Sequence, residues 1–203
     1  MAGSASTKEF RLGVLGSGEG SNFGAIVGAC RDGAVPATVA VVLSDMKEAV
    51  ILQRAREAKV ACAHIEPGRF RTKLDESAEA AYIKALNDAE VDLVVLAGFM
   101  RILKGEFLRA FEGRVVNVHP SLLPSFPGLE AWKQALEAGV KWTGVTVHYV
   151  DQGIDSGPII AQEPVPVRED DTPESLYARI QEVERVLYPK AISVIAERLM
   201  DEG

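Results

Sequence analysis

The stretch Val115-Val-Asn-Val-His-Pro-Ser-Leu-Leu-Pro124 begins as an apolar run rich in β-branched residues, which predicts a buried strand. Asn117 and His119 stand two positions apart in this run, so on a strand their side chains project from the same face. Pro120 lacks a backbone donor and disfavours helical backbone at His119, so we expect the strand to end there. Open α/β sheets place their active sites at the carboxyl ends of parallel strands. The stretch therefore predicts a catalytic polar pair, although a turn-forming Asn and a core His are the alternative for an isolated Asn-x-His.

Apolar segments on both sides of this stretch alternate with segments of helical periodicity, which predicts an α/β fold. Residues 92–97 are continuously apolar, as in a parallel sheet with both faces covered. Residues 143–150 alternate with period two, and 159–167 carry Pro164 and Pro166, which mark an edge strand. Further strands are expected at 12–16, 39–43 and 61–65, and helices at 23–30, 47–59, 130–139 and 172–200. Pro189 is expected to kink or break the last helix.

The bulk composition favours a soluble cytoplasmic protein that acts on small molecules. With 203 residues, a net charge of −7 and no signal peptide or membrane span, the chain lacks the basic character of proteins that bind nucleic acid or anionic membranes. Cys30 and Cys62 fit neither a disulfide nor a metal pattern, and packing explains them. We expect a disordered lead at 1–10 and one domain at 11–203, with a nucleotide-binding half at about 11–112 and a catalytic half at about 113–203. A monomer or a homodimer fits the sequence equally well.

The segment Ser17-Gly-Glu-Gly-Ser-Asn22 joins a strand to a helix, an arrangement that presents free backbone N–H groups to a phosphate. Ser21 and Asn22 can also cap the helix, so a capped turn without a ligand is the alternative. The segment lacks the lysine of a P-loop and the third glycine of a dinucleotide fingerprint. Asp45, after the next strand, could still act as the ribose-binding acid of a nicotinamide-dependent oxidoreductase.

Two other loops have a composition suited to ligand binding. Gly68-Arg-Phe-Arg-Thr-Lys73 carries three cations, which suit an anionic substrate tail or simply a solvated face, and Thr72 could cap the next helix. Gly98-Phe-Met-Arg-Ile-Leu103 follows a strand directly and could line a flat pocket of aromatic size or begin a helix.

Four separated segments match one known family, and together they extend over nearly the whole chain from about Arg11. They are 17–22, 95–103, 117–124 and 144–159, the last with Asp155-Ser-Gly-Pro-Ile159. On these motifs the chain resembles the phosphoribosylglycinamide formyltransferases, folate-dependent enzymes of purine biosynthesis. The resemblance implies a formyltransferase-type fold, with a Rossmann-like parallel sheet that continues into a smaller mixed sheet and helices on both faces. The Asn-x-His-Pro-Ser-Leu-Leu-Pro and Asp-x-Gly-Pro motifs are shared by all folate-linked formyltransferases, whereas the glycine loop points to the phosphorylated acceptor.

The resemblance also implies a reaction and a set of site residues. The reaction is transfer of the formyl group of 10-formyltetrahydrofolate, a co-substrate, to the amine of glycinamide ribonucleotide. The implied catalytic residues are Asn117, His119 and Asp155, with no metal. The implied ribonucleotide-binding residues are Gly20, Ser21, Asn22, Gln181 and Glu184, the last two being three apart and so on one helix face. The implied folate-binding residues are Lys73, Met100, Arg101, Ile102, Leu103 and Asn117.

Formyl transfer to an amine passes through a tetrahedral oxyanion, which hydrogen-bond donors in a dry site stabilise. Asn117 can supply a neutral N–H and a protonated His119 a charged one, and a nearby Asp155 would favour that protonated form. His119 could then protonate the departing folate nitrogen. Thr146 and His148 share a strand face and could support His119 from behind or serve structure alone.

Two positions depart from the family pattern. Lys73 stands where arginine is common, which keeps the charge but loses the bidentate fork. Glu19 places a negative charge beside the expected phosphate, so its side chain should point away. The alternatives are a 10-formyltetrahydrofolate hydrolase, a methionyl-tRNA formyltransferase, a nicotinamide-dependent dehydrogenase and a non-catalytic nucleotide-binding module.

Overall fold

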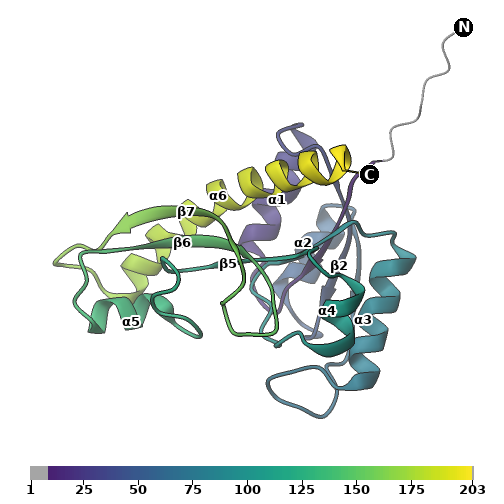
Figure 1. Ribbon diagram of the computed structural model, residues 1–203, viewed down its shortest axis with the longest axis horizontal. Helices are drawn as coiled ribbons and strands as arrows, with labels where there is room; N and C mark the ends of the chain where they lie inside the picture. Colours follow the sequence, from purple (N-terminus) through teal and green to yellow (C-terminus); the bar gives the residue numbers. More distant parts are fainter. Residues whose placement is uncertain (1–8, 203) are drawn as a thin grey trace, which may run out of the picture.

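The computed structural model describes residues 9–202 as one seven-stranded sheet with helices packed against it (Figure 1). The strands are β1 (Arg11–Leu15), β2 (Thr38–Ser44), β3 (Ala61–His64), β4 (Leu93–Leu96), β5 (Val115–His119), β6 (Trp142–Tyr149) and β7 (Ile159–Pro166). The helices are α1 (Ser21–Arg31), α2 (Val50–Glu57), α3 (Glu76–Asp88), α4 (Gly105–Ala110), α5 (Ala131–Glu137) and α6 (Pro173–Asp201).

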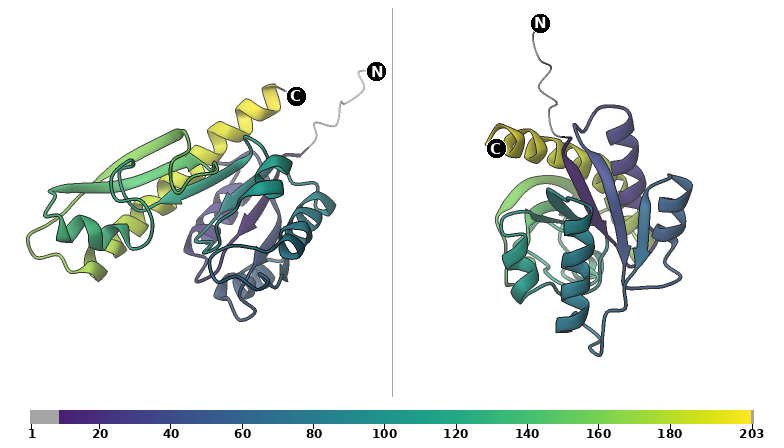
Figure 2. Two further views of the ribbon diagram at one scale, coloured as in Figure 1. Left: turned by 60° about the horizontal axis from the view of Figure 1, so that its bottom comes forward. Right: turned by 90° about the vertical axis from the view of Figure 1, so that its right-hand side faces the viewer.

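The sheet has the strand order β3-β2-β1-β4-β5-β6-β7. The pairs from β3 to β5 are parallel, whereas β6 and β7 are antiparallel to their neighbours. The prediction of a parallel sheet that continues into a smaller mixed one is confirmed, and β7 with its two prolines is an edge strand as expected. Figure 2 shows β6, β7 and α5 extending away from the part that holds β1 to β4. Because β1 to β5 are parallel, their carboxyl ends lie along one edge of the sheet, where ligands bind in such sheets.

Helices cover both faces of the sheet, as predicted. On one face α1, α2 and α6 contribute Ile26, Ile51 and Ile192 to one apolar core. On the other face α3 and α4 contribute Tyr82 and Phe107 to a second core. The longest helix, α6, runs beside both parts of the sheet (Figures 1 and 2). Its buried residues share one apolar core with residues of β4 and of β5 and β6, so α6 joins the N-terminal half of the chain to the C-terminal half.

Pro189 does not break α6, which continues from Pro173 to Asp201. A proline removes one helical hydrogen bond, but here its neighbour Tyr188 is fully buried and its hydroxyl lies 3.0 Å from the carbonyl oxygens of both Leu96 and Val116. These contacts tie the middle of α6 to β4 and β5. Tertiary packing thus outweighs the local cost of the proline.

The start of three helices differs from the prediction. Asp75, not Thr72, caps α3, since its carboxylate accepts from the backbone N–H of Ala78 at 3.0 Å. Neither Ser21 nor Asn22 caps α1, because the cap position falls on Gly20, which has a left-handed φ of 70°. The third helix, α2, begins at Val50 rather than at residue 47.

Of the expected disordered lead, residues 1–8 lie outside the described part of the chain. Phe10, which that expectation included, is buried, and its carbonyl accepts a 2.9 Å bond from the N–H of Thr38. The ordered core therefore begins before Arg11. Between residues 9 and 202, no helix is long and apolar enough to cross a membrane.

Candidate active site

Segments that follow β1, β4 and β5 lie together at the carboxyl edge of the sheet. The turn after β1 is bonded on one side to β2, through Gly16 N–H and the Leu43 carbonyl at 3.1 Å, and on the other to Gly98 after β4, through the N–H of Ser17 at 3.1 Å. The strand order reverses at this position, between β1 and β4. The glycine loop and the 98–103 segment thus flank the crevice in which α/β sheets bind ligands.

His119 and Asp155 form the centre of the site. Nδ1 of His119 lies 3.3 Å from Oδ2 of Asp155, and both side chains are largely buried. The same carboxylate oxygen accepts a 2.8 Å bond from the N–H of Gly128. Asp155 has a left-handed φ of 49°, which is rare for a residue other than glycine and tends to occur where function requires it. The contact between Asp155 and His119 holds the loop after β6 against the end of β5.

The other ring nitrogen of His119, Nε2, lies 2.9 Å from the carbonyl oxygen of Phe126. Both nitrogens therefore face an acceptor, and the doubly protonated imidazolium satisfies both at once. Donation from Nε2 of His119 to a developing oxyanion therefore requires its contact with the Phe126 carbonyl to break.

Asn117 is held by His148, which lies opposite it in the β5–β6 register. Nδ1 of His148 is 2.8 Å from the carbonyl oxygen of Tyr149, which can only accept, so Nδ1 carries the proton. Nε2 is then an acceptor and faces Nδ2 of Asn117 at 3.3 Å. Burial lowers the pKa of His148, which favours this neutral form. Asn117 consequently retains a second N–H for a ligand.

Thr146 anchors the loop that follows His119. Its hydroxyl donates to the Ser121 carbonyl at 2.7 Å and accepts from the N–H of Leu123 at 3.0 Å and from Nε2 of Gln162 at 2.9 Å. Gln162 and the Phe126 carbonyl were missed in the sequence. Gln162 pairs with Thr146 across β6 and β7. The alternation of side chains along these strands could therefore have indicated that Gln162 lies on the same face as Thr146. A backbone carbonyl has no sequence signal.

Among the predicted ribonucleotide residues, Asn22 and Glu184 meet although they lie far apart in sequence. Nδ2 of Asn22 donates to Oε2 of Glu184 at 3.0 Å in a buried position. Burial raises the pKa of Glu184 to about 7. Oδ1 of Asn22 is buried and, among the described residues, has no hydrogen-bond partner. Gly20, Ser21 and Gln181 are adjacent to this pair in the chain or on the same helix face.

Four of the predicted folate residues, 100–103, are consecutive, but their side chains do not form a single surface. Met100 is exposed, whereas Leu103 is buried in the core with α3 and α4. Lys73 forms a parallel β-bridge with Ile102 and places its ammonium 4.4 Å from the centre of the Phe70 ring. The basic loop is therefore joined to the 98–103 segment.

The side chain of Arg101 is mostly buried and pairs with Asp45. Its Nε lies 2.7 Å from Oδ2 of that buried carboxylate, whose Oδ1 accepts from the hydroxyl of Ser17. Asp45 thus has internal partners on both oxygens, which argues against its predicted role as the ribose-binding acid of an oxidoreductase. Glu19 is exposed.

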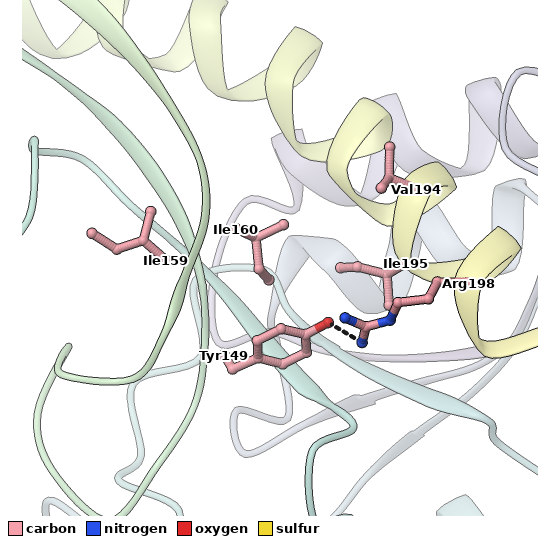
Figure 3. A pocket seen from close by; sticks show the side chains of 6 residues that line it. All are labelled: Tyr149, Ile159, Ile160, Val194, Ile195 and Arg198. Carbon is pink, nitrogen blue, oxygen red and sulfur yellow. Dashed lines mark hydrogen bonds between the residues drawn. The ribbon is translucent and has the colours of Figure 1, made fainter. Parts of the chain in front are cut away.

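The two best-defined hollows lie elsewhere. One, of about 250 Å³, is lined by Tyr149, Ile159, Ile160, Val194, Ile195 and Arg198 (Figure 3). Tyr149 and Arg198, which are hydrogen-bonded to each other, also line a second hollow beside α4. Neither contains a predicted site residue. Within residues 9–202, no group of three or more His, Cys, Asp or Glu side chains is placed to hold a metal ion.

Residues 10–192 match the family model described as formyl transferase. The chain belongs to the formyl transferase family. It is 42% identical over 182 residues to the phosphoribosylglycinamide formyltransferase of Bacillus subtilis, covering 90% of this chain and 92% of that protein. The crystal structure of glycinamide ribonucleotide transformylase 1 from Symbiobacterium toebii superposes with a TM-score of 0.89 at 50% identity, covering 94% of this chain and 89% of that one. The predicted resemblance, fold class and folate-dependent transferase class of this family member are confirmed.

Other members of the family are longer. The chain spans 14% of the trifunctional purine biosynthetic protein adenosine-3 of Drosophila melanogaster, to which it is 44% identical over 192 residues. It also covers 62% of a formyltetrahydrofolate deformylase from Pseudomonas syringae, with a TM-score of 0.85 and 27% identity. The family fold is therefore found with more than one activity.

Proposed function

We propose that this formyl transferase moves the formyl group of 10-formyltetrahydrofolate to the amine of glycinamide ribonucleotide, in purine biosynthesis. The observation that carries the proposal is the contact between His119 and Asp155 at the end of the strand that also carries Asn117, on the sheet edge that holds the glycine loop. The names of the Bacillus subtilis and Symbiobacterium toebii proteins support the same acceptor.

In the proposed reaction the amine of the ribonucleotide attacks the formyl carbon, and a new C–N bond forms. The carbonyl oxygen becomes an oxyanion, which the free N–H of Asn117 and the imidazolium of His119 stabilise. The bond between the formyl carbon and the folate nitrogen then breaks, and that nitrogen takes a proton from His119. The attacking amine releases its own proton to bound water or to a carboxylate. Asp155 holds the ring of His119 and stabilises its positive charge.

The two substrates would occupy opposite sides of this centre. Gly20, Ser21 and Asn22 would hold the phosphate through backbone N–H groups at the start of α1, with Gln181 and Glu184 on the rest of the ribonucleotide. Lys73, Met100, Arg101, Ile102, Leu103 and Asn117 would border the folate, where Lys73 offers a charge to the anionic tail. The division into halves near residue 112, the cytoplasmic location and the monomer or homodimer state belong to this proposal.

Hydrolysis of 10-formyltetrahydrofolate is the second candidate, because the same fold carries a deformylase and water could take the place of the amine. The buried Asn22–Glu184 pair beside the glycine loop favours transfer, since hydrolysis needs no phosphorylated acceptor.

One assay separates the two candidates. The purified protein is mixed with 10-formyltetrahydrofolate, with and without glycinamide ribonucleotide, and tetrahydrofolate formation is followed. We expect product only when the ribonucleotide is present, together with stoichiometric formylglycinamide ribonucleotide. Product without the acceptor would favour hydrolysis, and no product in either mixture would refute formyl transfer.

A further inference from the structure

Asp45 follows β2 at the carboxyl edge of the sheet and connects segments on both sides of the crevice. Its Oδ1 accepts a 2.5 Å hydrogen bond from the hydroxyl of Ser17, the first residue of the glycine loop. Its Oδ2 accepts a 2.7 Å bond from Nε of Arg101 in the proposed folate segment. Asp45 is 1% exposed at its side chain and Arg101 14%, so solvent screens this ion pair little.

Ser17 and Arg101, the two partners of Asp45, each form further hydrogen bonds. The Ser17 hydroxyl, while donating to Asp45, accepts from the N–H of Met100 at 2.8 Å. Nη1 of Arg101 donates to the carbonyl oxygens of Phe70, at 3.2 Å, and of Arg71. The carboxylate thus holds three segments together: the glycine loop, residues 98–103 and the basic loop at 68–73.

We propose that Asp45 is a positioning residue that sets the glycine loop and the 98–103 segment in one arrangement, so that binding of the two substrates is coupled. The inference rests on the proposed function, because that function assigns the ribonucleotide phosphate to one segment and the folate to the other. A buried carboxylate with short, charge-assisted bonds to both is a suitable link, because neither segment can shift without breaking one of them. Coupling between sites has this physical form, a free energy carried by contacts that both ligands bias.

Three variants cut the link at different points. Asp45→Asn keeps an oxygen for the Ser17 hydroxyl but removes the charge opposite Arg101. Ser17→Ala removes the bond between the glycine loop and Asp45, together with the acceptor of the Met100 N–H, and leaves the Asp45–Arg101 pair in place. Arg101→Met removes the other partner of Asp45 and leaves the Ser17–Asp45 bond.

Asp171→Asn is the matched control. Asp171 is also a buried carboxylate, 2% exposed at its side chain, and pairs at 2.6 Å with Arg179, which is 18% exposed. It precedes α6 and belongs to no segment assigned here to a substrate. Both aspartate variants should lower the thermal unfolding temperature, so a purely structural role for Asp45 would make them behave alike.

Calorimetric titrations with glycinamide ribonucleotide and with tetrahydrofolate, which lacks the formyl group and cannot react, supply the readout. We expect Asp45→Asn to weaken both ligands by about five-fold or more, and to raise both KM values with kcat changed less than about two-fold. Ser17→Ala should weaken tetrahydrofolate and Arg101→Met should weaken the ribonucleotide, although each residue lies on the other side of the link. Asp171→Asn should leave both affinities within about two-fold of the wild type.

The inference is overturned if Asp45→Asn changes the affinity for one ligand only or for neither, or if Ser17→Ala affects only the ribonucleotide. It is also overturned if Asp171→Asn weakens both ligands to the same extent. Failure of the proposed function looks different, since the wild-type protein itself would then form no formylated ribonucleotide. Because Arg101→Met leaves the Ser17 hydroxyl with its bonds to Asp45 and to the Met100 N–H, its effect on the ribonucleotide decides the matter even if Asp45→Asn does not fold.

Discussion

Nδ1 of His119 lies 3.3 Å from Oδ2 of Asp155, although the two residues belong to different strand-to-loop junctions. The same carboxylate oxygen accepts a 2.8 Å bond from the N–H of Gly128, so the carboxylate cannot turn away without losing that bond. Two loops are thus fastened around one imidazole, which places its ring at a defined position. Positioned donors of this kind contribute most to the stabilisation of an oxyanion.

Asp155→Asn removes the charge beside His119 while keeping the size of the side chain. We expect kcat for formyl transfer to fall by about 10²- to 10³-fold, with the affinity for glycinamide ribonucleotide nearly unchanged. Steady-state kinetics and calorimetry measure the two quantities. Asp151→Asn is the control, because Asp151 lies in the same loop and its side chain bonds, among residues 9–202, to Gly153 and Ser156 within that loop. An equal loss of kcat and affinity in Asp155→Asn would show that Asp155 binds rather than catalyses.

His148→Leu leaves the Asn117 amide without its acceptor and the Tyr149 carbonyl without its donor. A less well oriented Asn117 should stabilise the oxyanion less, so we expect kcat to fall by about ten-fold, below the full loss of one oxyanion donor. Asn117→Ala should cost more, and adding His148→Leu to it should cost little further activity because the two residues act as one unit. Independent, additive losses would contradict this link.

Glu184 should make stability depend on pH. Burial raises its pKa from 4.5 in the unfolded chain to about 7 in the fold, so the folded state favours the neutral acid. The stabilisation is complete below pH 4.5 and is lost as the pH rises through 7. We expect this carboxyl to reduce the free energy of unfolding by at most about 3 kcal/mol between pH 4.5 and 8.

Glu184→Gln tests this assignment, since glutamine keeps an acceptor for Asn22 but does not titrate. Urea denaturation at pH 5 and pH 8 should show a smaller decrease in stability for the variant than for the wild type. Identical pH dependence in the two proteins would mean that Glu184 is ionised in the folded state throughout this range.

Gly20→Ala should destabilise the turn that begins α1. Gly20 has a φ of 70°, and a Cβ there would lie 2.7 Å from Cγ1 of Ile51. We expect a loss of about 1–3 kcal/mol in the free energy of unfolding, measured by chemical denaturation, together with weaker ribonucleotide binding. Gly18→Ala is the control for stability, because no atom lies within 4 Å of its added Cβ and its φ is not positive. Equal stability losses in both variants would contradict the steric explanation.

The helix boundaries show where local patterns and the fold disagree. Pro189 predicted a kink or a break in α6, but the helix is unbroken there, and the buried hydroxyl of Tyr188 bonds to two strands beside that position. Thr72 was a plausible cap for α3, but the loop brings Asp75 into that place, where it also accepts from the N–H of Arg69 at 3.1 Å. Contacts far away in the sequence decided the first outcome, whereas a neighbouring residue with a stronger capping side chain decided the second.

The sequence by itself determined the order of strands and helices, the glycine turn and the placement of Asn117 and His119 on one strand face. These features follow from side-chain periodicity and backbone preferences, which act over a few residues. Only the tertiary structure decided which distant groups meet: Asn22 with Glu184 across 162 positions, Asp45 with Arg101, and His148 with Asn117. Such pairs depend on how the sheet orders its strands and folds its loops, and no local preference specifies that arrangement.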